Sequence, residues 1–264
     1  MPVKIATPVS HLFNDNETAK ELMLLSDILE LRENSEIKKN MKGPYLFHSR
    51  LNILAKWYPT QVQQLKKIEN DNIELISFHI MSCYQKNGIL KIHGREIQFG
   101  LEDKMSYEEM SNNIKHNIKI VKDIFGKKIK IQVENIPYLL TNAYDRITDA
   151  DFISSIVNDN NLYFLLDIPH AVITSINTNK DYMEYIQSLP LNKCLQLHIS
   201  SWSLDGKYAV DSHDKMNNES WNIFNEVFKL VKNNVKYVTI EYYKHKEALK
   251  KQLIQLKEMI RWKI

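Results

Sequence analysis

Nine histidine, aspartate and glutamate side chains lie at or just after the ends of short apolar runs, where they could bind metal ions. They are His48 in YLFHSR, His79 in LISFHI, Glu134 in IQVENIP, Asp167 and His170 in FLLDIPH, His198 in LQLHISS, Asp211 and His213 in AVDSHD, and Glu241 in VTIEYY. Imidazole and carboxylate together form the ligand set of zinc, iron and manganese sites. The sequence therefore offers the side chains for a centre with several metal ions.

Each of these residues also has an ordinary structural interpretation when it is taken alone. A histidine at a strand end is more often a hydrogen-bonded polar group than a ligand, and a buried glutamate can pair with a lysine. Brought together without a cation, however, so many buried ionisable groups would each cost several kcal/mol. Whether the fold gathers them in one place therefore decides between the two interpretations.

The apolar runs that carry these residues alternate with stretches of helical spacing. The candidate strands are Val3–Val9, Ile28–Arg32, Tyr45–His48, Ile73–Ile80, Ile129–Asn135, Tyr163–Ile168, Cys194–Ser200 and Tyr237–Tyr242. The candidate helices are Thr60–Glu69, Tyr107–Phe125, Asp149–Asn158, Lys180–Ser188, Ser220–Asn233 and Lys246–Trp262. Such alternation around eight strands is typical of an α/β protein with a (β/α)8, or TIM, barrel. The carboxyl ends of all its strands meet on one face, so we expect the nine side chains to share one rim.

Two further features complete the predicted fold. The short extended pieces Ile89–Ile92 and Glu96–Phe99 predict a β-hairpin inserted after strand four. Asp211 and His213 are expected in the loop that follows strand seven. No linker, repeat or low-complexity segment divides the chain, so we expect one TIM-barrel domain over residues 1–264.

Composition limits the classes of partner. The formal net charge is +3, and Lys and Arg are spread along the chain, which argues against nucleic acid. The start of the chain lacks the apolar segment of a signal peptide, and no apolar run approaches the roughly 18 residues of a membrane span. The two cysteines, Cys83 and Cys194, imply no disulfide framework and are expected to be packing residues. We therefore expect a cytoplasmic protein with no membrane partner.

The order of the nine residues resembles that of enzymes in the xylose isomerase/endonuclease IV-like superfamily of TIM barrels. Endonuclease IV-type apurinic endonucleases, which hold three zinc ions, have the order His, His, Glu, Asp-x-x-His, His, Asp-x-His, Glu. Glu134, Asp167, His198 and Glu241 are similar to the four-ligand set of sugar isomerases and epimerases. Those isomerases generally lack the additional histidines, so they are the weaker match.

The chain most fully resembles the multinuclear non-heme iron-dependent oxidative enzymes, the family of the methanobactin-biosynthesis oxidase. The matching segments are ISFHIMS, VENIP, LLDIPH, LQLHISSW, AVDSHD followed by ESWNIFNEVFKL, and VTIEYY. The Asp-x-His segment that leads into a helix with Trp221 is the most specific of them, because endonucleases of type IV have a Gly-rich turn there. The resemblance covers strands two to eight.

The chain departs from the pattern of that family at three places. Pro169-His170 stand where many members have an Asn pair, Phe78 where many have Asp, and Tyr242-Tyr243 where a Trp-Asp pair is common. The first change adds a metal ligand. The last removes the Asp to which a proton-transfer role could be assigned.

The resemblance implies an iron-dependent oxidase in which the nine residues hold two or three iron ions, with zinc or manganese as the alternative metals. The substrate would be a cysteine in a ribosomally synthesised precursor peptide, the oxidant would be dioxygen, and a partner protein would present the peptide leader. A substrate thiolate binds iron well and would anchor the reacting carbon beside the metal.

Other functions remain open at this point. An endonuclease IV-like zinc phosphodiesterase acting on abasic DNA would use the clustered metals to activate water. The modest charge and the lack of a clustered basic loop near the ligands argue against it. An isomerase and a non-enzymatic metal-binding module are the remaining interpretations.

Overall fold

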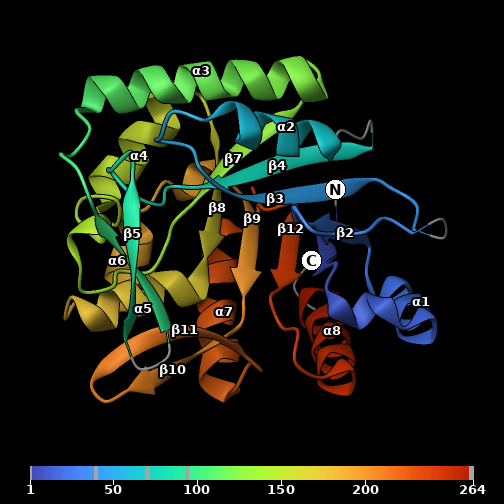
Figure 1. Cartoon of the computed structure of the whole chain (residues 1–264). Helices are drawn as coiled ribbons and strands as arrows, with labels where there is room; N and C mark the ends of the chain where they lie inside the picture. Colours follow the sequence, from blue (N-terminus) through green and yellow to red (C-terminus); the bar gives the residue numbers. More distant parts are fainter. Residues whose placement is uncertain (1, 39–40, 69–71, 93–94, 262–264) are drawn as a thin grey trace.

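A computed structural model describes residues 2–38, 41–68, 72–92 and 95–261 of the chain. Within these residues, eight parallel strands close into a barrel in the order β1-β12-β9-β8-β7-β4-β3-β2 (Figure 1). The barrel strands are β1 (Lys4–Pro8), β2 (Ile28–Leu31), β3 (Tyr45–Asn52), β4 (Ile73–His79), β7 (Lys130–Glu134), β8 (Tyr163–Asp167), β9 (Cys194–Ile199) and β12 (Tyr237–Ile240). Each predicted strand overlaps one of these, so the predicted TIM barrel is confirmed; the domain boundaries stay a prediction.

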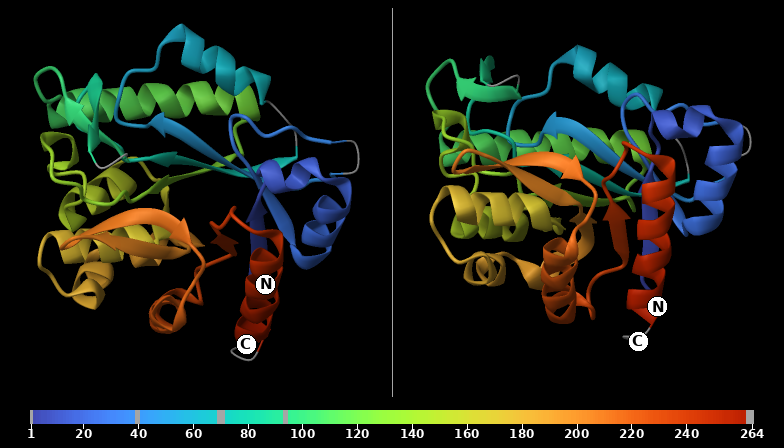
Figure 2. Two further views of the ribbon diagram at one scale, coloured as in Figure 1. Left: turned by 60° about the horizontal axis from the view of Figure 1, so that its bottom comes forward. Right: turned by 90° about the horizontal axis from the view of Figure 1, so that it is seen from below.

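Helices surround the barrel, with α2 and α3 on one side and α7 and α8 on another (Figures 1 and 2). The helices are α1 (Asn16–Leu25), α2 (Pro59–Lys67), α3 (Tyr107–Phe125), α4 (Ala150–Asp159), α5 (Ile168–Asn177), α6 (Tyr182–Ser188), α7 (Asn218–Val231) and α8 (Lys246–Arg261), with short 3-10 helices at His11–Asn14, Asn142–Tyr144 and Leu191–Lys193. Helices α1 and α5 were not predicted. The described part of the segment between β2 and β3 contains no helix, and its residues 32–38 form a loop.

Helix α5 begins directly at the end of β8, and the sequence carries the signal for it. The Asp167 carboxylate accepts a hydrogen bond from the backbone N–H of His170 at 2.6 Å, and Pro169 lies in the first turn. Asp is favoured as the cap of a helix and Pro in its first turn. The strand therefore ends at Asp167, and His170 belongs to the first turn of a helix.

Two β-hairpins extend the barrel. Their strands are β5 (Asn87–Ile92), β6 (Arg95–Gly100), β10 (Ser201–Asp205) and β11 (Tyr208–Asp214). The β5–β6 hairpin follows β4 as predicted, although His93 and Gly94 lie outside the described residues. The β10–β11 hairpin corrects the expectation for Asp211 and His213, which lie in a paired strand and not in a loop.

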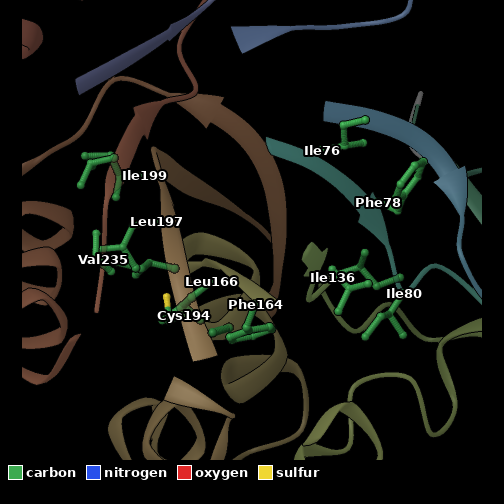
Figure 3. Close-up of a cluster of buried hydrophobic side chains, with 14 of the residues drawn as sticks. Ile76, Phe78, Ile80, Ile136, Phe164, Leu166, Cys194, Leu197, Ile199 and Val235 are labelled. Carbon is green, nitrogen blue, oxygen red and sulfur yellow. The ribbon is translucent and has the colours of Figure 1, made fainter. Parts of the chain in front are cut away.

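Alternating residues of each barrel strand point to opposite sides of the sheet. On β9, Leu197 and Ile199 pack in the apolar layer between barrel and helices, part of which Figure 3 shows. Gln196 and His198 point inside, where they contact residues of other strands. The barrel interior is apolar at one end, where Ala6, Ile28, Leu46, Leu75 and Tyr237 form a cluster. Two residues further along those strands the interior becomes polar, and there the candidate site begins.

Candidate metal centre

The structure links all nine predicted residues into one network of contacts at the carboxyl-terminal rim of the barrel. The contacts run from His48 and His79 to Glu134, from Glu134 to His198 and on to Glu241 and His213, and from His213 through Asp211 to His170 and Asp167. Six of the nine are buried; His79, Asp211 and His213 are partly exposed. The expectation of a shared rim is thus confirmed.

Glu134 lies at the centre of the network. Its Oε2 is 2.8 Å from His79 Nε2 and 3.4 Å from His48 Nε2. Its Oε1 is 3.0 Å from His198 Nδ1. The two oxygens of one carboxylate therefore face two different sets of imidazoles.

Glu241 occupies a similar position on the other side of His198. Its Oε1 lies 3.3 Å from His198 Nδ1, and its Oε2 lies 3.0 Å from His213 Nε2. The Nδ1 atom of His213 is 3.3 Å from Asp211 Oδ2. Because β11 carries both Asp211 and His213, the β10–β11 hairpin brings them over the barrel mouth.

Three groups of side chains offer ligand atoms that lie within 4.8 Å of one another, as the ligands of one ion do. Among the described residues these groups are His48–Glu134–His198, Glu30–His198–Glu241 and Glu134–Asp167–His170. His170 also contacts Asp211 at 3.5 Å. His170 thus shares a group of ligand atoms with Asp167 and Glu134. Asp211, which comes from the β10–β11 hairpin together with His213, contacts His170 from outside this group.

Three of the histidines have one ring nitrogen held by the protein while the other faces the network. His48 Nδ1 is 2.9 Å from Ser77 Oγ, His170 Nδ1 is 2.9 Å from the Asn135 carbonyl oxygen, and His198 Nε2 is 3.1 Å from Glu30 Oε2. Metal-binding histidines show this arrangement, because the outer hydrogen bond fixes the tautomer and the ring orientation. The barrel thus leaves the inner nitrogen of each of these rings facing the network.

Several inner atoms are buried without a hydrogen bond. Among the described residues, Glu134 Oε2 and His198 Nδ1 have no hydrogen-bond partner of acceptable geometry, although other ligand-type atoms lie within 3.4 Å of each. Buried polar atoms are seldom left in this state. Lone pairs that converge without hydrogen bonds fit a metal ion, and the donor set of imidazole and carboxylate suits iron, zinc or manganese.

The electrostatics of the site follow from burial and mutual pairing. Burial and the charge of Arg32 hold the pKa of His48 well below its usual value, so its imidazole is neutral. Burial alone would lower the pKa of His198, but Glu241 and Glu30 raise it well above its usual value. Burial raises the pKa of Asp167 to about 7. Without a metal, protons therefore carry part of the positive charge that these carboxylates require.

Glu30, Arg32 and Tyr243 belong to the site but were not predicted. Glu30 is fully buried beneath His198, and Arg32 forms ion pairs with Glu30 and with Glu241. Tyr243 places its hydroxyl 3.2 Å from Glu241 Oε1. A charged residue inside the apolar run ILEL was the available signal for Glu30, because strand interiors rarely bury an unpaired carboxylate.

The three departures from the oxidase pattern have different structural consequences. Phe78 points away from the site and packs against Trp57, with ring centroids 5.1 Å apart. His170 joins the network as described above, and Tyr243 lines the mouth of the site. Two of the three changes thus alter the site itself.

A pocket of about 950 Å3 opens above the network. Its outer wall comes from the loops after β1 and β2, and Arg32, Lys38 and Arg50 line it. Lys38 already donates to the carbonyl oxygens of Phe13 and Asn14, whereas the exposed Arg50 guanidinium has no partner among the described residues. The pocket wall therefore carries both basic residues and, with Glu36, Glu134, Asp211 and Glu241, carboxylates.

Neither cysteine contributes to the site. Cys83 and Cys194 are buried and unpaired, and burial raises the pKa of the Cys83 thiol to about 11 and that of Cys194 to about 12. Both thiols therefore stay protonated, in agreement with a packing role. None of the described helices combines the length and apolar character needed to cross a membrane.

Solved structures of low sequence identity share the fold. A D-psicose 3-epimerase from Clostridium cellulolyticum H10 superimposes with a TM-score of 0.61 at 13% identity, covering 98% of this chain and 99% of the epimerase. A xylose isomerase domain protein from Planctomyces limnophilus gives a TM-score of 0.56 at 10% identity, covering 98% and 96%. These similarities support the barrel fold.

Comparison of sequences identifies relatives of this chain and its family. A UPF0276 protein of Caulobacter vibrioides is 26% identical over 99 residues, which are 38% of this chain and 35% of that protein. One from Shewanella sediminis is 19% identical over 191 residues, 72% of this chain and 66% of the relative. The chain thus aligns with about a third of the length of the Caulobacter relative. The family described as RiPP precursor modification enzyme MbnB/TglH/ChrH matches residues 57–260, and the chain belongs to this family.

Proposed function

We propose that this protein is an iron-dependent oxidase that uses dioxygen to modify a cysteine of a ribosomally synthesised precursor peptide. The observation that carries the proposal is the network of five histidines and four carboxylates beneath an open pocket. The family supplies the peptide class of the substrate. The metal and the oxidative chemistry are the proposed part.

In this proposal, the nine residues of the network bind two or three iron ions. Glu134 bridges two of them, because its oxygens face different imidazoles. Asp211 and His213 bind one ion together with His170. Zinc and manganese are the alternative metals, since they accept the same ligands.

The site favours an external thiolate. Its candidate ligands are imidazoles and carboxylates, and both cysteines of the chain are buried in the packing. Thiolate is a strong ligand for iron. Because both cysteines of the chain are buried elsewhere, a substrate cysteine entering the pocket would meet no competing thiolate of the protein. Bound iron would supply the oxygen-activating and electron-transfer chemistry that the oxidation of cysteine needs.

The residues of the chain then bind and orient the peptide. Arg50 offers a guanidinium at the pocket for a carboxylate of the peptide. The 950 Å3 pocket is large enough for a few residues around the cysteine. A partner protein that presents the peptide leader, and a cytoplasmic location, complete the proposal.

The test compares iron-loaded and zinc-loaded protein. The candidate substrate is a short cysteine-bearing peptide encoded next to the gene, assayed with its partner protein, and the control is the same peptide with that cysteine changed to serine. We expect dioxygen uptake and a mass change on the cysteine with iron alone. Zinc-dependent cleavage of abasic duplex DNA without dioxygen uptake would replace this proposal with the endonuclease alternative.

A further inference from the structure

Glu30 and Arg32 form an ion pair beside the network, in which Glu30 is buried and Arg32 is partly exposed. Glu30 lies in β2 with no exposed surface, and Arg32 Nη2 is 2.8 Å from its Oε1. The same Arg32 nitrogen forms an ion pair with Glu241 Oε1. A guanidinium thus stands between two carboxylates, in the space where an ion shared by them would lie.

The other oxygen of Glu30 holds His198. Glu30 Oε2 lies 3.1 Å from His198 Nε2, and a carboxylate can only accept. The Gln196 amide nitrogen is also 3.1 Å from Nε2, but its two protons are used by Glu30 Oε2 and Thr239 Oγ1, so in the neutral ring Nε2 carries the proton. The lone pair is then on Nδ1, which faces Glu134 at 3.0 Å and Glu241 at 3.3 Å. Glu30 therefore sets the orientation in which His198 can bind a metal.

Both oxygens of the Glu30 carboxylate have close contacts with the protein. Besides His198, its Oε2 accepts from Gln196 Nε2 and, at 3.2 Å, from Thr239 Oγ1. Its Oε1 has no hydrogen bond of acceptable geometry among the described residues, but it lies 2.8 Å from Arg32 Nη2 in an ion pair. A carboxylate with these contacts orients a metal-binding histidine and does not itself bind the metal.

The balance of charge supports the same assignment. The candidate ligand carboxylates are Glu134, Asp167, Asp211 and Glu241, which together carry four negative charges that two divalent ions neutralise. Glu30 would add a fifth negative charge in a buried place, and Arg32 cancels it. The Glu30–Arg32 pair is therefore neutral as a unit and leaves the charge of the metal centre unchanged.

We propose that Glu30 is a positioning residue that fixes His198 with Nδ1 toward the metal, and that Arg32 prevents Glu30 from binding an ion itself. This inference rests on the metal centre of the proposed function. It does not depend on the choice of iron or on the substrate.

The first test uses Glu30→Gln, with Glu74→Gln as the matched control. Glu74 also lies in a barrel strand, but its contacts are Lys4 and Tyr237, away from the site. Affinity for zinc is measured by competition with a chromophoric chelator, ions per chain by elemental analysis, and the His198 tautomer by 15N NMR of the zinc-loaded protein. We expect Glu30→Gln to bind zinc about 10- to 100-fold more weakly, with a changed His198 signal and an unchanged number of ions at saturation.

The second test uses Arg32→Gln. Glu30, His198 and Glu241 offer ligand atoms within 4.8 Å of one another, and loss of the Arg32 guanidinium frees both carboxylates to hold an ion. We expect the number of zinc ions per chain at saturation to rise toward one more than in the wild type. An unchanged number would overturn the role assigned to Arg32.

Other outcomes overturn the role of Glu30. Loss of one whole ion per chain in Glu30→Gln would make Glu30 a ligand, and behaviour equal to that of Glu74→Gln would make it part of the barrel packing. If Glu30→Gln does not fold, Thr239→Val removes one neutral hydrogen bond to Glu30 and should weaken zinc binding in the same direction; no weakening overturns the inference. A wild-type protein that binds no metal would overturn both this inference and the proposed function.

Discussion

The carboxylate of Glu134 has each of its oxygens directed at a different group of histidines. A carboxylate in this arrangement can span two ions about 3.5–4 Å apart. We expect Glu134→Ala to lower the metal content by more than one ion per chain, measured by elemental analysis with Glu74→Ala as the control. Full retention of metal in Glu134→Ala would contradict the bridging role.

His213 combines a place in the network with an unusual backbone conformation. Its φ is +45°, a region that costs L-residues about 1–2 kcal/mol, although His is among the residues found there. We expect both His213→Ala and His213→Gly to lose one ion per chain while the other ions remain. His116→Ala, on the exposed face of α3, should lose none.

The glycine variant separates ligation from backbone strain. Glycine adopts positive φ without strain, so His213→Gly keeps the shape of β11 better than His213→Ala does. Equal metal loss in the two variants is expected if the imidazole is the ligand. A His213→Gly protein with its full complement of metal would show that the third ion does not depend on this side chain.

The nine candidate residues were predictable at this scale because seven lie at or just after the ends of recognisable strands, and Asp211 and His213 come in the segment after the seventh strand. It did not predict Glu30 and Arg32, because one glutamate in ILEL has no partner in the neighbouring sequence. Their partners, Glu241 and His198, are more than 160 residues away along the chain. Only the closed barrel brings these four side chains together, and a linear pattern cannot show that contact.

At the scale of elements, Asn135 joins the ends of β7 and β8. Its side chain donates to the Asp167 carbonyl oxygen at 3.0 Å and accepts from the Asp167 N–H at 2.9 Å, while its own carbonyl oxygen contacts His170 Nδ1. We expect Asn135→Ala to lower the free energy of unfolding of the metal-free protein by about 1–3 kcal/mol, since it leaves buried backbone groups unpaired. Urea denaturation followed by circular dichroism measures this.

The control for that experiment is Asn112→Ala on the exposed face of α3, which should change stability by less than about 0.5 kcal/mol. The Asn135 variant should also bind zinc more weakly, because β8 and α5 position Asp167 and His170. Equal unfolding curves for the two variants would show that the Asn135 contacts do not support this rim.

Helix α5 and the β10–β11 hairpin were not predicted, although the sequence contains signals for both. Asp167 and Pro169 are the sequence signals for the start of α5. The apolar run of the predicted strand continues to Ile168, which is the first residue of that helix, and so the apolar pattern predicts strand where the helix begins. Asp205-Gly206 between two alternating segments is a hairpin signal, and Gly206 has a φ of +62°. The loop after β2 is different: a barrel predicts a helix there, and the sequence gives no reason why residues 32–38 instead form a wall of the pocket.

At the scale of the whole molecule, the fold pairs buried imidazoles with carboxylates, and this pairing favours protonated imidazoles before any metal binds. Burial opposes protonation of His170 and His198, yet Asp167 raises the pKa of the first and Glu241 that of the second well above the usual value. These imidazoles therefore hold protons near neutral pH in the metal-free protein. A metal ion needs their neutral form, so binding must displace those protons.

The sign of the pH dependence follows from this competition. As pH falls, protons occupy His170 and His198 more fully, so zinc affinity should fall; as pH rises through their raised pKa values, affinity should rise and then level off. Near neutral pH, calorimetric titrations in buffers of different ionisation enthalpy should give a net release of protons on zinc binding. His116→Ala should release the same number as the wild type, because His116 lies outside the network, whereas His170→Ala should release fewer. Proton uptake on binding, or an affinity that increases as pH falls, would contradict the pairing of these histidines with the carboxylates.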